Sequence, residues 1–389
     1  MHKAEGVAVA KRNWFVLILA WFVLGGGIRA QELPRDEIQA NLSGYFDNFR
    51  VIVIYPNISA SKRISETTGI TGRYLVDAIS AASMRSQFTV DGVTSATSRT
   101  SGGSDNTPDE LRHEFGAGIT QLIAGRTLAV NTLYSTEHDY TSTTLAGNFT
   151  QLFAKKNTTL QLGVVRSWDK VFPQNRTWKR DKNVVTYSGD LSQILSKRLI
   201  AQLIFSYNET SGFLSDNYQV VTIIDGDRAR RYEPVHPDSR LRRAAAMRVN
   251  YLLTPISSLR LGYRYYWDTW DVNSHTFSGF YQRYLGSATI LGLGLRRYNQ
   301  SRAFFFQPSY SEPLTYMSVD SKLNSGYTNE LEFQLTLDGS SGKWPQLGEK
   351  TQLNFSLNFF HRHTDSADWH SRRKNLYAYY TNIGLRYRF

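Results

Sequence analysis

The chain has 389 residues, no cysteine and a net charge of +12, and 41% of its residues are hydrophobic, with a mean hydropathy of −0.39. The lack of cysteine excludes disulfides, thiolate chemistry and covalent c-type haem, and the polarity excludes a bundle of membrane helices, each of which needs about 20 apolar residues. Aromatic residues make up 13% of the chain. An aromatic-rich chain of average polarity fits a barrel whose strands show one face to lipid and the other to water.

The N-terminal segment has the layout of a cleavable signal peptide. Two lysines and an arginine precede the unbroken apolar run Trp14–Leu24, and Ala30 supplies a small residue for cleavage. The run is too short to span a bilayer comfortably. We therefore predict a signal peptide over 1–30 and one outer-membrane barrel over 31–389, with an N-terminal membrane anchor as the alternative to the signal peptide.

Positive charges are scattered along the mature chain at alternate positions of the predicted strands. A nucleic-acid-binding protein would gather them in one run or on one helix, so we expect no nucleic acid partner. We interpret the charges as part of the lumen and rims of a water-filled barrel, with a bias toward anions.

The predicted strands begin near Glu37, and the first hairpin turns near 47–50. Pro56 falls within the second strand, where we expect a bulge or an edge because proline cannot donate a backbone hydrogen bond. Further along, apolar and polar residues alternate for ten residues over 259–268. A tilted membrane strand needs about 9–11 residues, whereas strands of soluble proteins have about 5–6. The same alternation recurs at 201–208, 291–296, 330–337, 352–359 and 377–389.

Two kinds of connection separate these strands. Short turns are predicted near 65–68, 125–126, 155–157, 196–197, 255–257 and 286–287. Long polar loops are predicted at 83–109, 171–181, 211–238 and 302–325, with short connections on the same side near 138–141 and 271–273. Short periplasmic turns and longer outer loops are typical of outer-membrane barrels. Together these elements predict an all-β, transmembrane, antiparallel up-and-down barrel of about 16 strands with both termini in the periplasm.

The closing strand ends in Phe389, and Tyr387 lies on the same face. A terminal phenylalanine on an alternating strand resembles the recognition signal used by outer-membrane assembly machinery. We therefore expect the barrel assembly machinery and outer-membrane lipid as partners, and the cell outer membrane as the location.

Short motifs follow one another over most of the mature chain: YLVDAISAAS at 74–83, VTSATS at 93–98, DLSQI at 190–194, EPVHPDSR at 233–240, YRYYWDTW at 263–270 and SHT at 274–276. In this order they resemble a widespread family of bacterial outer-membrane barrels known only as a domain of unknown function. The extended turn at 338–349 departs from the family pattern. Members are often encoded beside a small lipoprotein, a thioredoxin-like protein and a flavin transferase, so the resemblance implies a barrel that partners a periplasmic lipoprotein or redox complex.

Charged residues at alternate strand positions form the first candidate site, the lumen wall. They are Arg73, Asp77, Asp190, Arg248, Arg260, Arg264, Asp268, Glu330, Glu332, Arg362, Arg386 and Arg388. They either pair across strands and line a wet wall, or form a selectivity ladder that is basic near 248–264 and 362–388 and acidic near 330–332. The sequence offers no separate plug domain, so any constriction must come from a long loop that folds inward.

A second candidate is the motif around His236, Asp238 and Arg240, at the end of a long loop. These residues either bind a partner or an anion, or form a rigid corner between loop and strand, which proline and aspartate favour. We favour the rigid corner. Asp225 and Asp227 are also considered as calcium ligands, but the spacing of an EF-hand loop is absent.

Histidines are the remaining candidates. A metal would need His361, His363 and His370 together, and we favour rim positions for them instead. An outer-membrane hydrolase would need a histidine with a partner that the sequence does not place; the candidates are His113, His138 and His275. We therefore predict no catalytic residue, cofactor or metal. The leading hypothesis is a porin-like channel for small solutes with some anion preference, ahead of the periplasmic-complex scaffold and the hydrolase.

Overall fold

The computed structural model describes residues 33–49, 51–78, 111–173, 177–216, 219–225, 228–366 and 374–389. The predicted signal peptide over 1–30 and the predicted loop over 83–109 lie outside these residues. No helix among the described residues is long and apolar enough to cross a membrane.

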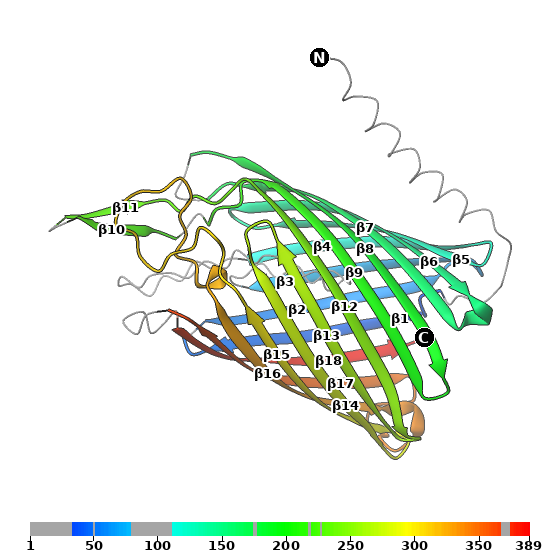
Figure 1. Cartoon of the computed structure of the whole chain (residues 1–389). Coiled ribbons are helices and arrows are strands. Elements are labelled where there is room, and N and C mark those ends of the chain that lie inside the picture. The colour runs from blue at the N-terminus through cyan, green and yellow to red at the C-terminus, as the bar shows by residue number, and fades with distance from the viewer. Residues whose placement is uncertain are drawn as a thin grey trace.

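Sixteen antiparallel strands form one closed barrel, as the sequence predicts (Figure 1). They are β1 (Glu37–Asp47), β2 (Ile52–Arg63), β3 (Thr68–Ala78), β4 (Leu111–Ile123), β5 (Arg126–Thr136), β6 (Tyr140–Phe153), β7 (Thr158–Val171), β8 (Arg180–Ser196), β9 (Leu199–Gly212), β12 (Ser239–Thr254), β13 (Ser257–Asp268), β14 (Asn273–Leu285), β15 (Thr289–Gln300), β16 (Gly326–Asp338), β17 (Thr351–Thr364) and β18 (Asn375–Arg388). The barrel closes where β1 pairs with β18 along its whole length, from Glu37 opposite Arg388 to Asp47 opposite Ala378. Closure removes the exposed strand edges that lipid cannot hydrogen-bond.

Short turns lie at one end of the barrel, at the positions that the sequence predicts. Between β4 and β5, Ala124 and Gly125 both have positive φ, of 49° and 76°. Positive φ at both central residues defines the two-residue turn that matches the twist of the flanking strands. Two of the connections at this end contain the 3-10 turns η1 (Ala154–Lys156) and η3 (Gly339–Ser341), the second of them in the extended turn before β17.

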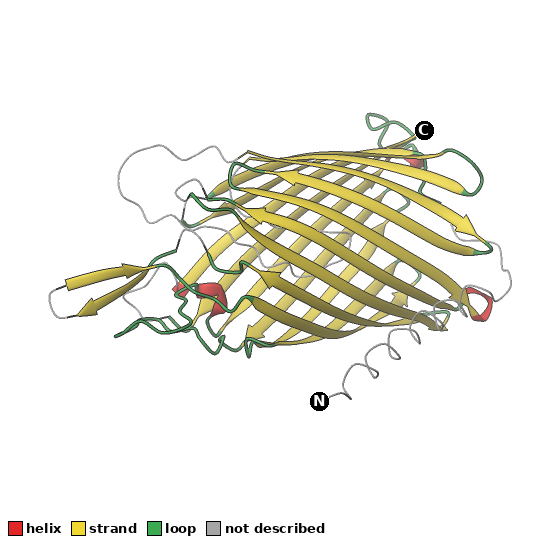
Figure 2. Cartoon of the chain, turned by 90° about the horizontal axis from the view of Figure 1, so that it is seen from above, coloured by secondary structure: helices red, strands yellow, loops and turns green. Residues whose placement is uncertain are grey.

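The long connections lie at the other end, and one of them differs from the prediction. The segment predicted as a loop over 211–238 contains a separate hairpin, β10 (Val221–Asp225) paired with β11 (Arg228–Tyr232). This hairpin projects beyond the end of the barrel (Figure 2). The predicted loop over 302–325 contains the 3-10 turn η2 (Ser321–Leu323).

Pro56 lies inside β2, opposite Leu42 of β1, where we expected a bulge or an edge. Pairing between β2 and β3 stops after Ile54 and resumes at Asn57 in the same register. The missing proline N–H is therefore accommodated by a short gap in the ladder rather than by an extra residue.

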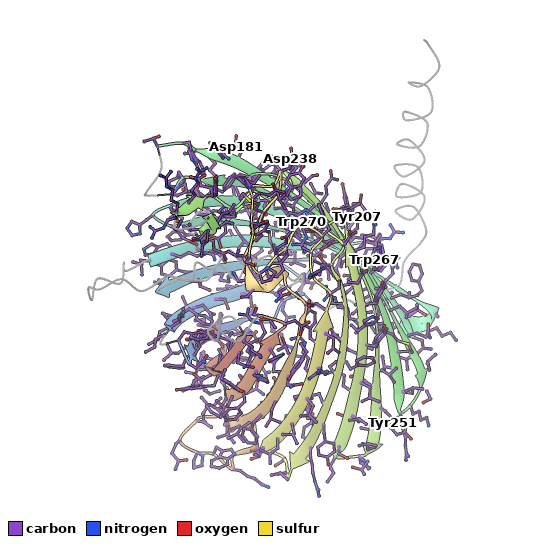
Figure 3. The ribbon with its side chains drawn as sticks, turned by 60° about the vertical axis from the view of Figure 1, so that its left-hand side comes forward. Asp181, Tyr207, Asp238, Tyr251, Trp267 and Trp270 are labelled. Atoms are coloured by element: carbon purple, nitrogen blue, oxygen red, sulfur yellow. The ribbon has the colours of Figure 1, made fainter. Side chains whose placement is uncertain are left out.

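Apolar side chains cover the outside of the barrel. Leu261, Leu295 and Phe359 are 53%, 62% and 52% exposed, whereas Ser167 and Thr210, which point inward, are almost completely buried. Tyr207, Tyr251 and Trp267 also belong to the outer face (Figure 3). An exposed apolar band around a polar interior reverses the arrangement of a soluble protein, and it is stable only where lipid replaces water.

Two glycines make room for an aromatic ring on the inner wall. Phe280 of β14 is buried, and its ring lies against Gly292 and Gly294 of β15. A Cβ at Gly292 would overlap this ring and would lie 3.1 Å from the Cβ of Gln334. Gly72 of β3, on the outer face, has nothing within 4 Å of its Cβ direction.

We predict that Gly292→Val lowers the free energy of unfolding by about 1–3 kcal/mol, because a close-packed site must shift to admit the new atoms. Gly72→Val is the matched control and should leave stability within about 0.5 kcal/mol of the parent. Urea unfolding in detergent, followed by tryptophan fluorescence, measures both. Equal midpoints for the two variants would show that the Phe280 ring is not fixed in this position.

Candidate functional site

The residues predicted to line the lumen all lie at strand positions that alternate with the outer apolar band. For Asp77 only the backbone position, opposite Arg112, is described. Register places the other members on the inner face: Arg73, Asp190, Arg248, Arg260, Arg264, Asp268, Glu330, Glu332, Arg362, Arg386 and Arg388. Strand pairing decides which of these side chains contact one another. By their ion pairs and their position along the barrel, we divide the charged residues of the wall into three zones.

The first zone is a chain of alternating charges near the long-loop end of β3, β4 and β5. Arg73 pairs with Glu114, whose second carboxylate oxygen lies 3.1 Å from Nη2 of Arg112. Arg112 also lies 3.4 Å from Glu137 and donates from Nε to the hydroxyl of Ser135. Arg112 and Glu114 are both buried. These charges neutralise one another, as expected for buried ions that are held by hydrogen bonds.

Asp169 of β7 forms a similar centre nearby. The hydroxyl of Ser142 donates to it at 2.7 Å, and Nζ of Lys182 lies 3.4 Å from its carboxylate. Tyr140 donates a further hydrogen bond to the same carboxylate. Asp169 has 2% of its surface exposed, and these three partners compensate the loss of water around its negative charge. The sequence reasoning did not select Asp169, because a lone aspartate on a strand carries no signal until register places a lysine opposite.

Arg240 and Asp268 join the lumen wall to the loop motif. The sequence assigned Asp268 to the lumen and Arg240 to the motif. Register places Arg242 opposite Asp268, and Arg240, two residues away on the same face of β12, reaches the Asp268 carboxylate with its Nε at 2.8 Å. Asp268 also accepts hydrogen bonds from the backbone N–H groups of Trp270 and Val272, at 2.8 and 3.1 Å. The guanidinium of Arg240 lies over the Trp270 ring at 4.2 Å. This ion pair therefore fixes the turn between β13 and β14.

The motif lies at the corner between the long loop and β12. The backbone carbonyl of Asp238 accepts from the N–H of Gly212, closing the base of the loop. His236 is buried, and its ring contacts Trp270 and Phe305 at centroid distances of 5.5 and 5.2 Å. Its Nδ1 donates to the carbonyl of Leu214, and its Nε2 has no hydrogen-bond partner among the described residues.

The His236 imidazole is held in its neutral form. Burial lowers the pKa of His236, and nearby Arg240 acts in the same direction. The carbonyl of Leu214 and the carboxylate of Asp320 oppose this effect without cancelling it. A proton added at Nε2 would place a charge without a partner between two aromatic rings.

The segment 301–325, with the turn 269–272 and the hairpin β10–β11, forms a structure that we call the loop cap. Its apolar side chains form two clusters. One consists of Trp270, Val272, Ala303, Phe305, Phe306 and Leu323, and the other of Val221, Ile223, Tyr310, Met317 and Val319. The Tyr310 hydroxyl links the chain around it by accepting from the N–H of Ser318 and donating to the carbonyl of Phe305, both at 2.8 Å. The sequence prediction of a polar loop is wrong here, and the run Phe304–Phe306 was the signal that could have corrected it.

The loop cap reaches the inner wall of the barrel. Arg362, on the inner face of β17, donates to the hydroxyl of Ser321 in η2 at 3.3 Å, and Asp320 interacts with Arg362 electrostatically. Gln300 donates to the carbonyl of Lys322 at 2.9 Å. Segment 301–325 is therefore tied to the inner wall at the long-loop end of the barrel.

The second zone lies between the other two, on β12 and β13 and nearer to the short-turn ends of these strands; it is basic and contains few ion pairs. Arg248 donates to Gln202 at 3.1 Å, and Gln202 donates to Asp190. The guanidinium of Arg260 lies 4.8 Å from the Phe280 ring centroid, and its side chain is exposed although it points inward. No carboxylate of the described residues lies within ion-pair distance of Arg248 or Arg260. These two like charges repel each other, and Glu332 attracts Arg260 from farther away.

The predicted acidic residues lie on β16, and their negative charges contrast with the positive charges on β12 and β13. Glu330 pairs with Arg296 at 3.3 Å, and Glu332 accepts from Gln334. The third zone, at the short-turn end, contains Arg386 and Arg388, whose Nε atoms lie 3.7 and 4.0 Å from the Glu37 carboxylate. The wall thus combines paired charges at both ends with a less neutralised basic strip between them.

The histidines considered for metal binding or catalysis lie elsewhere. His113 and His275 are on the outer face, where each forms a hydrogen bond with a tyrosine, at 2.9 Å to Tyr74 and 2.8 Å to Tyr263. His361 and His363 are at the outer rim, and His138 is in the turn between β5 and β6. His370 and Asp227 lie outside the described residues. Within the described residues, no group of three or more histidine or acidic side chains could hold a metal ion.

A family model described as a protein of unknown function (DUF3570) matches residues 28–179 and 168–367. The chain belongs to the DUF3570 family. This result confirms the resemblance seen in the sequence. None of the curated proteins compared matches this DUF3570 chain.

Solved structures similar to the DUF3570 barrel include a bacterial polysaccharide outer membrane secretin, with a TM-score of 0.52 and 7% identity over 92% of this chain and 100% of that one. The siderophore receptor PirA from Pseudomonas aeruginosa gives 0.45 and 11% over 85% and 57%, and the CymD monoaromatic hydrocarbon channel gives 0.40 and 9% over 91% and 87%. At these identities the secretin likeness supports the fold alone. With its apolar outer band, the chain is an outer-membrane β-barrel.

We predict that acidification loosens the loop cap. A histidine whose pKa is about 6.5 when exposed and lower when buried takes up a proton more readily in the open state. The stability of the closed cap relative to the open cap is then constant above about pH 6.5. It decreases as the pH falls from that value toward the lower pKa of His236 in the closed state. Hydrogen exchange of segment 301–325 measures it.

The control is His236→Phe, which keeps an aromatic ring between Trp270 and Phe305 without a titrating group. Its exchange rates, corrected for intrinsic pH dependence, should be flat over the same range. If parent and variant show the same pH dependence, His236 does not control the cap.

Proposed function

We propose that the protein is a porin-like channel for small anionic solutes. Inward-facing Arg260, exposed to water and without an ion-pair partner among the described residues, carries the proposal. A barrel of 16 strands is wide enough to hold an aqueous channel. Arg260 lies on the inner face three residues from the first residue of β13, and access of water to this part of the wall is what such a channel requires.

The distribution of charge supports an anion preference. On β12 and β13 the inward positions carry Arg240, Arg242, Arg248, Arg260 and Arg264 against the single acid Asp268. Asp268 is paired with Arg240. Arg248 and Arg260 have no ion-pair partner among the described residues, so the charges of these two arginines act on the lumen. A lumen wall of one sign raises the local concentration of counter-ions, and the glutamates of β16 place a weaker opposite field across it.

The loop cap supplies the size limit. It lies at the outer mouth and holds the inner wall through Ser321 and Arg362. A solute entering from outside would pass the cap before it reaches Arg248 and Arg260. A solute would thus meet a size limit at the cap before it meets the positive charges of the wall, and this order suits a selective channel for small solutes.

Two further expectations stay predictions. The scaffold role with a periplasmic lipoprotein or redox complex follows from the family resemblance, and recovery of such a partner in mild detergent would support it. Contact with the assembly machinery would use Tyr387 and Phe389, which are 44% and 49% exposed on the outside of the barrel.

We predict that Arg248→Glu combined with Arg260→Glu lowers the anion-to-cation permeability ratio at least about threefold, because the sign of the middle zone is reversed. The reversal potential of single channels in a planar bilayer under a salt gradient measures this ratio. Arg243→Glu is the matched control, since it changes the same charge on the outer face of β12.

Steady anion-selective conductance that the double variant alone reverses would support the proposal. Absence of conductance from a folded, heat-modifiable barrel would contradict it, as would equal selectivity in the double variant and the parent.

A further inference from the structure

On the outer face of β15 to β18, the apolar band ends along one line. Register places Arg297, Asn329, His361 and Tyr377 in a row across the four strands. The next outward residues toward the short-turn end are Leu295, Leu331, Phe359 and Tyr379, which are 62%, 41%, 52% and 46% exposed. Since long loops face outward in these barrels, the row marks the boundary between hydrocarbon and headgroups in the outer leaflet.

Arg297 is held in a fixed orientation at this boundary. Its guanidinium lies 3.8 Å from the Tyr327 ring centroid. Nε donates to the Asn299 side chain at 3.1 Å and Nη1 donates to the Asn329 side chain at 2.7 Å. Within the described residues, no carboxylate pairs with this charge, and Nη2 donates to no residue.

The rings beside Arg297 form a stacked platform. The Tyr327 ring stacks on His363 at 5.1 Å, and His361 stacks on Tyr377 at 4.5 Å. Asn375 ties the two histidines together, with its Oδ1 3.1 Å from Nε2 of His361 and 2.9 Å from Nδ1 of His363. Amphipathic rings of this kind are typical of the membrane interface. The platform spans three strands and leaves the guanidinium little freedom.

A fixed, unpaired cation at the edge of hydrocarbon is costly unless an anion lies beside it. The protein side of this site is already occupied by amides and a ring, so the anion must come from the lipid side. A planar guanidinium with free N–H groups suits phosphate oxygens in particular.

We propose that Arg297 and the Tyr327–His361–His363–Tyr377 platform bind the phosphate of an outer-leaflet lipid headgroup. The site lies on the outside of the barrel and does not depend on conduction through the lumen. It would fix one lipid at β15–β18, on the outer side of the wall whose inner face contacts η2 through Arg362.

Native mass spectrometry of the barrel in detergent tests this site, with lipid A carrying two phosphates as the probe and lipid A stripped of both phosphates as the comparison. Arg297→Gln should weaken binding of the phosphorylated probe at least about tenfold. Arg283→Gln removes the same charge from the outer face near the opposite end of β14, where Arg283 is exposed, and should change binding less than about twofold.

Arg297→Lys keeps the charge but not the planar fork, and we expect an intermediate loss of about threefold. If Arg297→Gln does not fold, as judged by heat-modifiability, the binding measured for Arg297→Lys tests the proposal in its place. The proposal is overturned if the Arg297 variants bind like the parent, if Arg283→Gln loses as much, or if the stripped lipid binds equally well. Channel selectivity should not change in any of these variants, which separates this site from the proposed function.

Discussion

Backbone hydrogen bonding in a medium without water governs this structure. Every N–H and C=O group within hydrocarbon must find a partner in the protein, and sixteen strands achieve this only because β1 and β18 meet over eleven residue pairs. Closure gives each strand one face toward lipid and one toward the interior. Strict alternation along the sequence follows, and so does a polar interior.

Charged side chains inside the barrel are neutralised to different extents in different parts of the wall. At the long-loop end, Arg112, Glu114 and Asp169 are buried and neutralised by neighbours on adjacent strands. Nearer to the short-turn end, Arg260 remains exposed and without an ion pair among the described residues. Burial without compensation would be prohibitive, so a wet interior at this height is the condition under which such an arginine is stable. In the proposed channel, the loop cap would limit which solutes reach Arg260 from outside.

The cap itself depends on the same inner wall. Asp268 holds the turn that carries Trp270, and Arg362 holds η2. Side chains of the inner wall therefore position part of the loop cap. This coupling explains why a motif at the start of β12 contributes both an inward-facing arginine and a buried histidine.

Much of the fold could be predicted from sequence because strand alternation is local. A period of two fixes which residues share a face, and this was enough to place Arg260 inward and Leu261 outward. Partners across strands could not be predicted, since the pairing of Arg240 with Asp268 depends on register between separate strands. The cap was missed for a different reason. Its core combines residues of three connections, and no single connection shows a repeating pattern.

The same lack of periodicity hid the β10–β11 hairpin, whose strands have five residues each. Pro56 shows the opposite case. The missing N–H of proline predicted an interruption of strand pairing correctly. Because the register of β2 with β3 is the same before and after Pro56, the interruption is a gap in the pairing and not a bulge.

Because the chain has no cysteine, the central claim, a water-filled interior at Arg260, can be tested directly. Single Arg260→Cys and Leu261→Cys variants, reconstituted in vesicles, would be treated with a charged thiol reagent that cannot enter lipid. The account predicts labelling of the cysteine at position 260 and none at position 261. The reverse pattern, or protection of both positions in folded protein, would contradict a wet lumen and the channel with it.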